Sequence, residues 1–149
     1  MVKIRLFNPS DAKSTSKLIR KALIEVNSKD YTPHVIKYMY DEFTPKYLVN
    51  LSQERRFFVA VDSNQVIGTA TIIDDYVGTV FVSPKNHGFG VGAKLMKYVE
   101  SFAKNQGIKI IRLYASITAV QFYEKLGYKI KEKNMTEEYG LTYEMTKEI

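Results

Sequence analysis

Apolar residues along the chain recur with two different periods, which alternate from one end to the other. A period of two is typical of strands, and a period near 3.6 is typical of amphipathic helices. The strand pattern covers residues 3–7, 56–61, 66–73, a run ending at 80–82, 109–115, 128–133 and 141–149. The helical pattern covers residues 9–26, 33–51, 91–104 and 118–126. The expected order is therefore β-α-α-β-β-β-α-β-α-β-β, in one α/β domain that spans residues 1–149.

Turn and cap residues agree with these boundaries. Pro9 marks a helix start, Pro45 interrupts the second helical region, and the polar residues 62–65 join two strands as a hairpin. Gly107 and Gly127 follow the ends of the last two helices. Three antiparallel strands, a parallel strand-helix-strand unit and a final pair of strands predict a mixed central sheet of about seven strands flanked by four helices.

Two segments carry patterns that fit a structural role as well as a functional one. Lys129, Lys131 and Lys133 alternate along a predicted strand, which indicates the solvated face of an edge strand more than a ligand site. The aromatic-rich helical region at 33–51 fits either a core or the lining of a substrate cleft. Neither pattern identifies a function.

Composition limits the classes of function. The 149 residues, 45% of them hydrophobic, suffice for one core. No apolar run approaches about 18 residues and no signal-peptide pattern opens the chain, so we expect a soluble, cytoplasmic protein with no membrane partner. The chain has no cysteine and its only histidines are His34 and His87, so we expect no disulfide, no thiolate nucleophile and no metal. The net charge of +6 favours anionic ligands, but the chain has no nucleic-acid-binding motif.

A strand, a glycine turn and a helix start follow one another between residues 80 and 96. Gly88, Gly90 and Gly92 stand at alternate positions after a strand that ends at Val82. Glycine costs a helix about 1 kcal/mol relative to alanine. We therefore interpret these glycines as leaving the N–H groups of the helix start bare toward an anion such as a phosphate. A connection that merely turns the chain is the alternative.

Two other phosphate-binding patterns do not fit this turn. A P-loop requires Gly-Lys-Ser/Thr, whereas residues 93–95 read Ala-Lys-Leu. A dinucleotide fingerprint requires a glycine directly after the strand and an acidic residue about 20 positions later. Here five residues separate Val82 from Gly88, and no Asp or Glu lies between Lys104 and Gln121.

A second motif lies between residues 116 and 128, and together the two motifs resemble the GNAT superfamily, the N-acetyltransferases that use acetyl-coenzyme A. The family's phosphate turn, Gln/Arg-x-x-Gly-x-Gly/Ala after Val-x-Pro, is matched by Val82, Ser83, Pro84, His87, Gly90 and Gly92. Its later signature, Ala-x-x-x-Tyr-Glu-Lys-x-Gly-Phe/Tyr, is matched by Ala119, Tyr123, Glu124, Lys125, Gly127 and Tyr128. His87 replaces the family's usual Gln or Arg, and Ser116 replaces an Asn that often precedes the tyrosine.

The resemblance implies a GNAT fold and an acyltransferase that moves an acetyl group from acetyl-coenzyme A to a primary amine by direct attack. It implies that Phe81 and Val82 hold the pantetheine arm through their backbone, and that Tyr123 protonates the leaving sulfur. A phenol with a pKa near 10 can donate to a thiolate while remaining protonated at neutral pH. The implied cofactor-binding residues are Phe81, Val82, His87, Gly88, Phe89, Gly90, Val91, Gly92, Ala93, Ser116, Ala119 and Tyr123.

Several points stay open at the level of sequence. Tyr123 could instead be a core tyrosine, and the chain could be a non-catalytic module on the same fold that binds an acyl-coenzyme A or a nucleic acid. The acceptor is a small-molecule amine or a protein amine, and a homodimer is compatible with the tyrosine-rich composition. The candidate general bases are Asp74, Asp75, Glu42, His34 and Tyr143.

Overall fold

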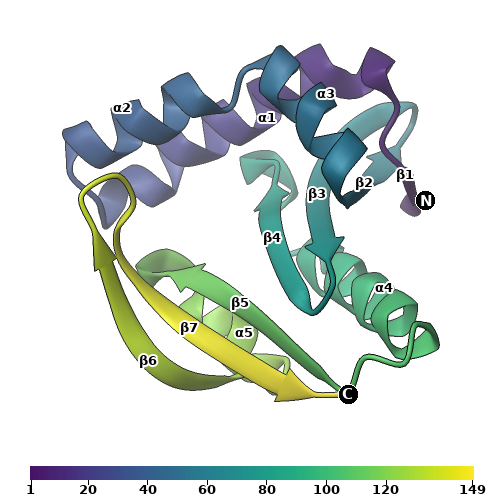
Figure 1. The fold of residues 1–149 in the computed structure, drawn as a ribbon. Coiled ribbons are helices and arrows are strands. Elements are labelled where there is room, and N and C mark those ends of the chain that lie inside the picture. The colour runs from purple at the N-terminus through teal and green to yellow at the C-terminus, as the bar shows by residue number, and fades with distance from the viewer.

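A computed structural model describes residues 1–149 and places every predicted strand in one mixed sheet (Figure 1). The sheet has seven strands in the order β1-β2-β3-β4-β5-β7-β6. The strands are β1 (Lys3–Leu6), β2 (Arg56–Asp62), β3 (Gln65–Ile73), β4 (Tyr76–Val82), β5 (Ile110–Ser116), β6 (Lys129–Thr136) and β7 (Gly140–Glu148). The α-helices are α1 (Ala12–Glu25), α2 (Pro33–Glu42), α3 (Pro45–Glu54), α4 (Val91–Asn105) and α5 (Val120–Lys125). The α/β fold class and the order of elements are as predicted.

The region 33–51 forms two helices where the sequence predicted one interrupted helical region, so the chain has five α-helices and not four. The break is at Pro45, which has no N–H to continue α2 and stands in the first turn of α3. The side chain of Thr44 caps the new helix by accepting the N–H of Tyr47 at 3.1 Å. The pair Thr32 and Pro33 begins α2 in the same way.

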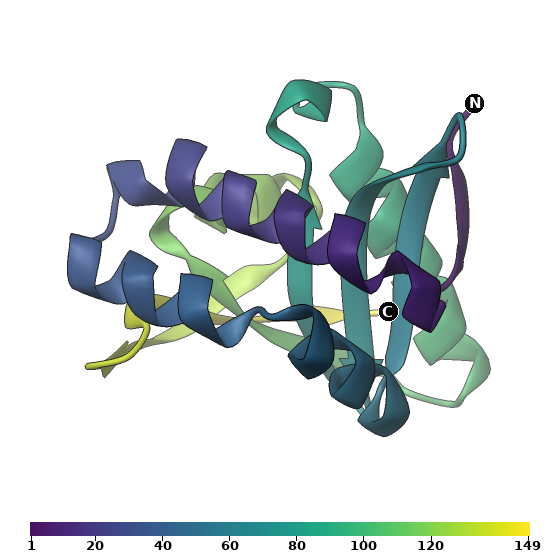
Figure 2. The same cartoon turned by 90° about the horizontal axis from the view of Figure 1, so that it is seen from above.

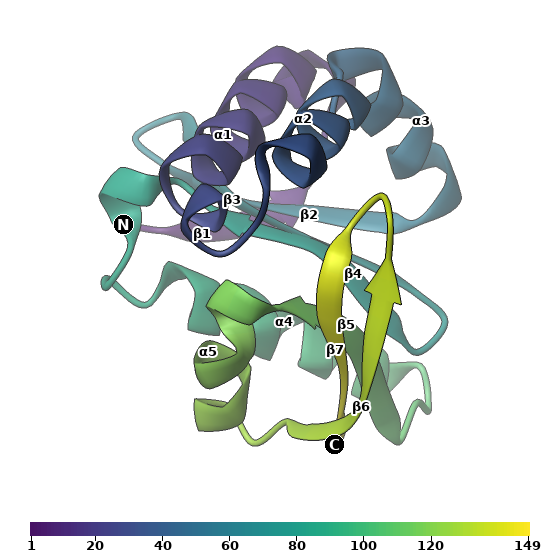
Figure 3. The same ribbon diagram turned by 90° about the vertical axis from the view of Figure 1, so that its left-hand side faces the viewer.

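Helices cover both faces of the sheet, and strand alternation explains how. In β2, Phe57 and Val59 belong to a core shared with α1, α2 and α3, whereas Phe58 and Ala60 belong to a core shared with α4 and α5. Figure 2 shows α1 and α2 side by side across the strands. Figure 3 shows α1–α3 on one side of the sheet and α4 and α5 on the other. None of these helices is both long and apolar enough to cross a membrane.

The sheet opens between its two parallel strands. β4 and β5 are paired only at Tyr76 with Arg112 and at Val77 with Leu113. Beyond Val77 the two strands diverge, as Figure 1 shows. The result is a split that widens toward the carboxyl ends of β4 and β5, where open α/β sheets bind ligands.

Strand β6 lies at the outer edge of the sheet, which confirms the interpretation of its alternating lysines. Residues from Lys129 to Met135 are all exposed, so both faces of this strand are solvated. Charged edge strands of this kind resist pairing with other chains.

Candidate functional site

The glycine turn leaves the end of β4 and enters α4. Gly88 and Gly90 have φ of 83° and 79°, in the left-handed region, and nothing lies within 4 Å of where a Cβ would be. Their backbone conformation is therefore the reason for glycine at these two positions. Gly90 is the residue that precedes the first turn of α4.

None of the backbone N–H groups from Gly88 to Ala93 donates a hydrogen bond within the chain, and the first amide that does is Lys94, to the carbonyl of Gly90 at 3.0 Å. The helix that follows has 15 residues, so its dipole places positive charge at this end. Free donors at the positive end of a long helix, directly after the exposed residues 88–90, form an anion-binding arrangement.

Gly92 has a different role from the other two glycines. A Cβ at Gly92 would lie 2.9 Å from the ring of Phe122, closer than real Cβ atoms approach their neighbours. Its φ is not in the left-handed region. Close packing of α4 against α5 therefore requires this glycine, in addition to any effect on the free amides.

The side chains of His87 and Phe89 differ from the free amides of this turn. The Nε2 of His87 donates to the carbonyl of Val82 at 3.0 Å, so its ring ties the turn back to the end of β4. The side chain of Phe89 is 78% exposed at the tip of the turn. The backbone, and not these side chains, supplies the donors.

The end of β4 presents its main chain to the split. Ser83 donates to the carbonyl of Ile67 in β3, and alternation along an antiparallel pair then turns the polar groups of Val82 away from β3. The side chain of Val82 packs in the core beneath α4. Phe81 points to the other face, where its ring meets Phe43 edge-on at 5.5 Å.

A β-bulge bends β4 before it reaches this end. Thr79 has a φ of 52°, and the pairing with β3 shifts here. The hydroxyl of Thr69 donates to the carbonyl of Thr79 at 2.7 Å, and that of Thr71 donates to the carbonyl of Gly78 at 3.0 Å. Thr69 and Thr71 are fully buried, so side-chain hydroxyls replace backbone partners where the strand bends away.

Tyr123 lies in α5 with its ring between Phe122 and Tyr128, at centroid distances of 5.0 and 5.7 Å. The residue is 5% exposed, and no hydrogen bond within the chain contributes to the electrostatics of its hydroxyl. Burial raises the pKa of Tyr123 above its ordinary value, with a further contribution from the nearby phenol of Tyr76. The hydroxyl is therefore protonated at neutral pH.

The neighbouring Tyr128 shows what a purely structural tyrosine looks like here. Its hydroxyl donates to Glu100 at 2.6 Å, and Glu100 also accepts from Lys147 at 2.9 Å. Burial and this carboxylate raise the pKa of Tyr128. Of the two buried tyrosines in contact, only Tyr123 has an unused hydroxyl.

Ser116 and Ala119 lie where β5 passes into α5. Ser116 ends β5 without a side-chain cap hydrogen bond, and Ala119 ends the 3-10 turn that follows. Because β4 and β5 are parallel, this turn and the glycine turn lie at the same edge of the sheet, on either side of the split. The structure thus brings together the predicted residues of both motifs.

The sequence profile of the acetyltransferase (GNAT) domain matches residues 23–149 of this chain. The chain belongs to the GNAT family. This confirms the resemblance on which the two motifs were interpreted.

Curated relatives and a solved structure agree with this assignment. The uncharacterized N-acetyltransferase YafP of Escherichia coli is 24% identical over 137 residues, which cover 91% of this chain and 87% of that protein. An uncharacterized N-acetyltransferase of Methanocaldococcus jannaschii is 31% identical over 78 residues, which cover 50% of this chain but only 34% of that protein. The crystal structure of PaiA N-acetyltransferase from Thermoplasma acidophilum in complex with coenzyme A is 20% identical, with a TM-score of 0.84 over 100% of this chain and 99% of that one. The predicted GNAT fold is confirmed.

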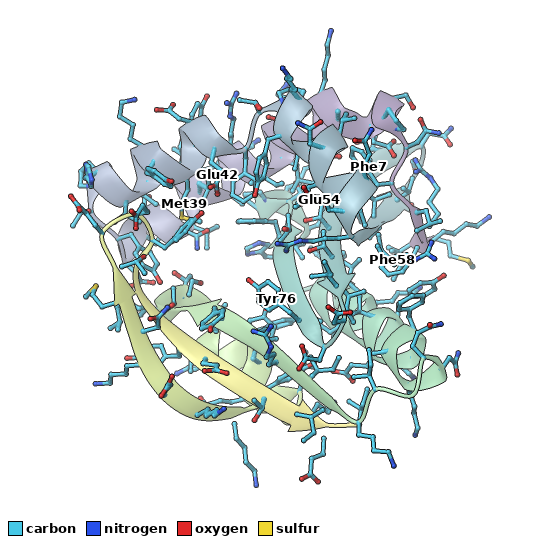
Figure 4. The ribbon with its side chains drawn as sticks, viewed as in Figure 1. Phe7, Met39, Glu42, Glu54, Phe58 and Tyr76 are labelled. Atoms are coloured by element: carbon cyan, nitrogen blue, oxygen red, sulfur yellow. The ribbon has the colours of Figure 1, made fainter.

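Two of the candidate bases of this GNAT domain already have partners. The carboxylate of Glu42 accepts from the hydroxyl of Tyr139 at 2.7 Å, and Asp75 accepts from the Nε of Arg112 at 3.0 Å. In Figure 4, α2 and α3 lie above the centre of the view, and β5 and β7 lie below it. Glu42 is on α2 and Tyr76 is on β4, on opposite sides of this centre.

The other three candidate bases are spread over the GNAT domain. Asp74 is exposed in the turn between β3 and β4, and His34 is exposed on α2. Tyr143 is half-buried in β7 beside Tyr31, whose pKa is raised mainly by its own burial. None of the three is among the groups that shift the pKa of Tyr123. No group of His, Asp or Glu side chains is arranged to hold a metal ion.

Two residues that the sequence did not single out lie beside the split. The guanidinium of Arg55 lies 5.4 Å from the centroid of the Tyr76 ring, and that of Arg112 lies 5.0 Å from the same centroid. Arg55 follows α3, whereas Tyr76 begins β4. No local pattern marks the two arginines, because only the pairing of β2, β3, β4 and β5 brings them to the same ring.

Proposed function

We propose that residues 1–149 act as a single N-acetyltransferase domain that uses acetyl-coenzyme A and a primary amine. The observation that carries this proposal is the row of free amides from Gly88 to Ala93 at the positive end of α4. A diphosphate fits these donors, and an extended pantetheine arm fits the open edge of β4 next to them. The complex of the Thermoplasma acidophilum neighbour with coenzyme A supports this choice of ligand.

The chain supplies binding groups for each part of the cosubstrate. Backbone donors hold the diphosphate, and since His87 is bonded to Val82, no side chain of the turn needs to contribute. The backbone of Val82, whose carbonyl accepts from His87, offers its N–H to the arm along β4, with the hydroxyl of Ser116 across the split. Acetyl-coenzyme A contributes an activated acetyl thioester whose sulfur must gain a proton when it leaves.

Tyr123 is the proposed proton donor for that sulfur. Its hydroxyl has no hydrogen-bond partner in the fold, and burial keeps it protonated through the neutral range. Burial disfavours a thiolate as much as a phenolate, so a raised pKa of Tyr123 does not by itself oppose proton transfer to the sulfur.

The experiment combines calorimetry with kinetics. We expect acetyl-coenzyme A to bind saturably to the wild type, and Tyr123→Phe to bind it equally well while kcat falls about 10²- to 10⁴-fold, the usual worth of a general acid. Tyr128→Phe is the matched control, because it removes the neighbouring hydroxyl and should lower stability while kcat is kept.

Three outcomes would count against the proposal. Absence of saturable binding at millimolar acetyl-coenzyme A would show that acetyl-coenzyme A is not the cosubstrate. Full activity of Tyr123→Phe would show that Tyr123 is not the proton donor. Binding without acetyl transfer to any member of an amine panel would identify a non-catalytic module on the same fold.

A further inference from the structure

The guanidinium of Arg55 has no hydrogen bond or ion pair within the chain, although it is partly buried. Its Nε is sealed from solvent and has no partner. Guanidinium groups have five N–H donors and remain charged at every pH that proteins tolerate. Its two Nη groups have no partner either, but they are not sealed. A charged group that no acceptor of the chain satisfies is costly, so the reachable Nη groups point to a partner from outside the chain.

The residues around Arg55 hold its guanidinium group in place, but none of them forms an ion pair that neutralises its charge. Its plane lies over the ring of Tyr76, and a Cβ at Gly78 would be 3.3 Å from its Nη1. Arg112 lies over the same ring, but its charge is balanced by Asp75 at 3.0 Å. Two guanidinium groups therefore lie over one aromatic ring, and only that of Arg112 has a carboxylate partner. The uncompensated charge belongs to Arg55.

Arg55 lies on the face of the sheet opposite α4. Val77 belongs to the core beneath α4, so strand alternation turns Tyr76, and Arg55 with it, to the face of α1–α3. The phenol of Tyr76 is close enough to Tyr123 to affect its pKa. Figure 4 shows Tyr76 directed into the region between α3 and the strands β5 and β7. An acceptor approaching from this face would meet Arg55 before it reached the base of the split.

We propose that Arg55 binds a carboxylate of the acceptor, so that the acceptor is an amino acid or another amine that carries a carboxylate. The inference rests on the proposed function and gives it a substrate class. Arginine matches a carboxylate with two parallel hydrogen bonds, and the ring of Tyr76 holds the fork in a fixed plane. An acceptor with only positive charges would place a cation against an unpaired guanidinium and would be rejected.

The test compares α-amino acids with their own α-amides, which keep the amine and lose the negative charge. In wild-type protein we expect kcat/KM to be about 10- to 100-fold higher for the acids, the usual worth of a charge-assisted hydrogen bond. Arg55→Met keeps the packing of the aliphatic part of the side chain and removes the guanidinium group. It should bring the ratio close to one, mainly through KM, while the affinity for acetyl-coenzyme A is unchanged.

Arg56→Met is the matched control. Arg56 is the next residue, is exposed, and lies 5.9 Å from the ring of Phe102 on the α4 face. It should change neither the ratio nor acetyl-coenzyme A binding. Titration of the preferred amino acid into protein saturated with coenzyme A gives a second readout, in which Arg55→Met should abolish the heat of binding.

The outcomes separate this inference from the proposed function. Equal use of acids and amides by the wild type would overturn the inference and leave the acetyltransferase intact. Preference for acids that survives in Arg55→Met would overturn the role of Arg55. Failure to bind acetyl-coenzyme A would overturn the proposed function itself. If Arg55→Met does not fold, Arg55→Lys keeps the charge without the fork, and a ratio as high as in the wild type would then contradict the proposal.

Discussion

Gly92 packs against Phe122, and this contact fixes how closely α4 and α5 approach each other. The two helices carry the two halves of the proposed site, the free amides on one and Tyr123 on the other. Gly92, which belongs to the glycine turn in the sequence, thus also helps to set the distance between the free amides and Tyr123. Gly88 and Gly90 differ, because their positive φ shapes the turn itself.

Gly92→Ala separates these two causes. Alanine improves helix propensity by about 1 kcal/mol, but a Cβ 2.9 Å from the Phe122 ring overpacks the contact, which typically costs about 1–3 kcal/mol. We expect lower stability in urea denaturation, together with reduced activity. In a Phe122→Ala background the same change should be stabilising. Equal changes in the two backgrounds would show that packing against Phe122 is not the reason for glycine.

At the scale of elements, β4 is shaped by the strand next to it. Thr69 and Thr71 of β3 donate their hydroxyls to the carbonyls of the bulge in β4. The bulge bends β4 near the point where it parts from β5. Two buried threonines thereby help to shape the edge along which we place the pantetheine arm.

Thr69→Val tests this support. Valine has nearly the same shape, so the main loss is the hydrogen bond to the carbonyl of Thr79, and an unsatisfied buried acceptor costs about 1–3 kcal/mol. We expect that drop in unfolding free energy and weaker binding of acetyl-coenzyme A in calorimetry. Thr142→Val, at a longer and exposed hydrogen bond of 3.4 Å, is the control and should change little. A Thr69→Val protein with unchanged affinity would show that the bulge does not depend on this hydroxyl.

The elements themselves were predictable from the sequence because their signals are local. The alternation at 56–61 and 66–73, the helix start at Pro9, the interruption at Pro45 and the glycine turn each act over a few residues. The bulge, the short pairing of β4 with β5 and the stacking of Arg55 on Tyr76 were not predictable, because each depends on strands that meet only in the folded sheet.

At the scale of the whole molecule, the end of the chain returns to its first helices. The tip of the β6–β7 hairpin reaches α2, where Tyr139 bonds to Glu42 at 2.7 Å and meets Tyr38 edge-on at 5.7 Å. Tyr31 donates to the carbonyl of Leu141 at 2.6 Å and accepts from the N–H of Ile117 at 2.8 Å. The two halves of the sheet are thus joined a second time, through α2 and the tip of the β6–β7 hairpin (Figure 1).

Tyr139→Phe tests this second connection. The hydrogen bond to Glu42 is exposed, so we expect global stability to change by about 1 kcal/mol or less. The hairpin tip should exchange its amide hydrogens faster, and KM for the acceptor should change while affinity for acetyl-coenzyme A stays the same. Tyr98→Phe is the control, because Tyr98 is exposed on α4 and forms no hydrogen bond. Unchanged hydrogen exchange at the tip would mean that the contacts with Tyr38 and Tyr31 hold it without the hydrogen bond to Glu42.

The short seam between β4 and β5 also bears on how the protein responds to heat and mechanical load. Backbone pairing between these neighbouring strands occurs at only two positions, so separating the four-stranded portion from the three-stranded one breaks little of the ladder. Partial opening along such a line requires less free energy than global unfolding. A molecule lodged in the split and touching both strands would act as a tie between the portions, which makes the proposed cosubstrate a component of the architecture as well as a reactant.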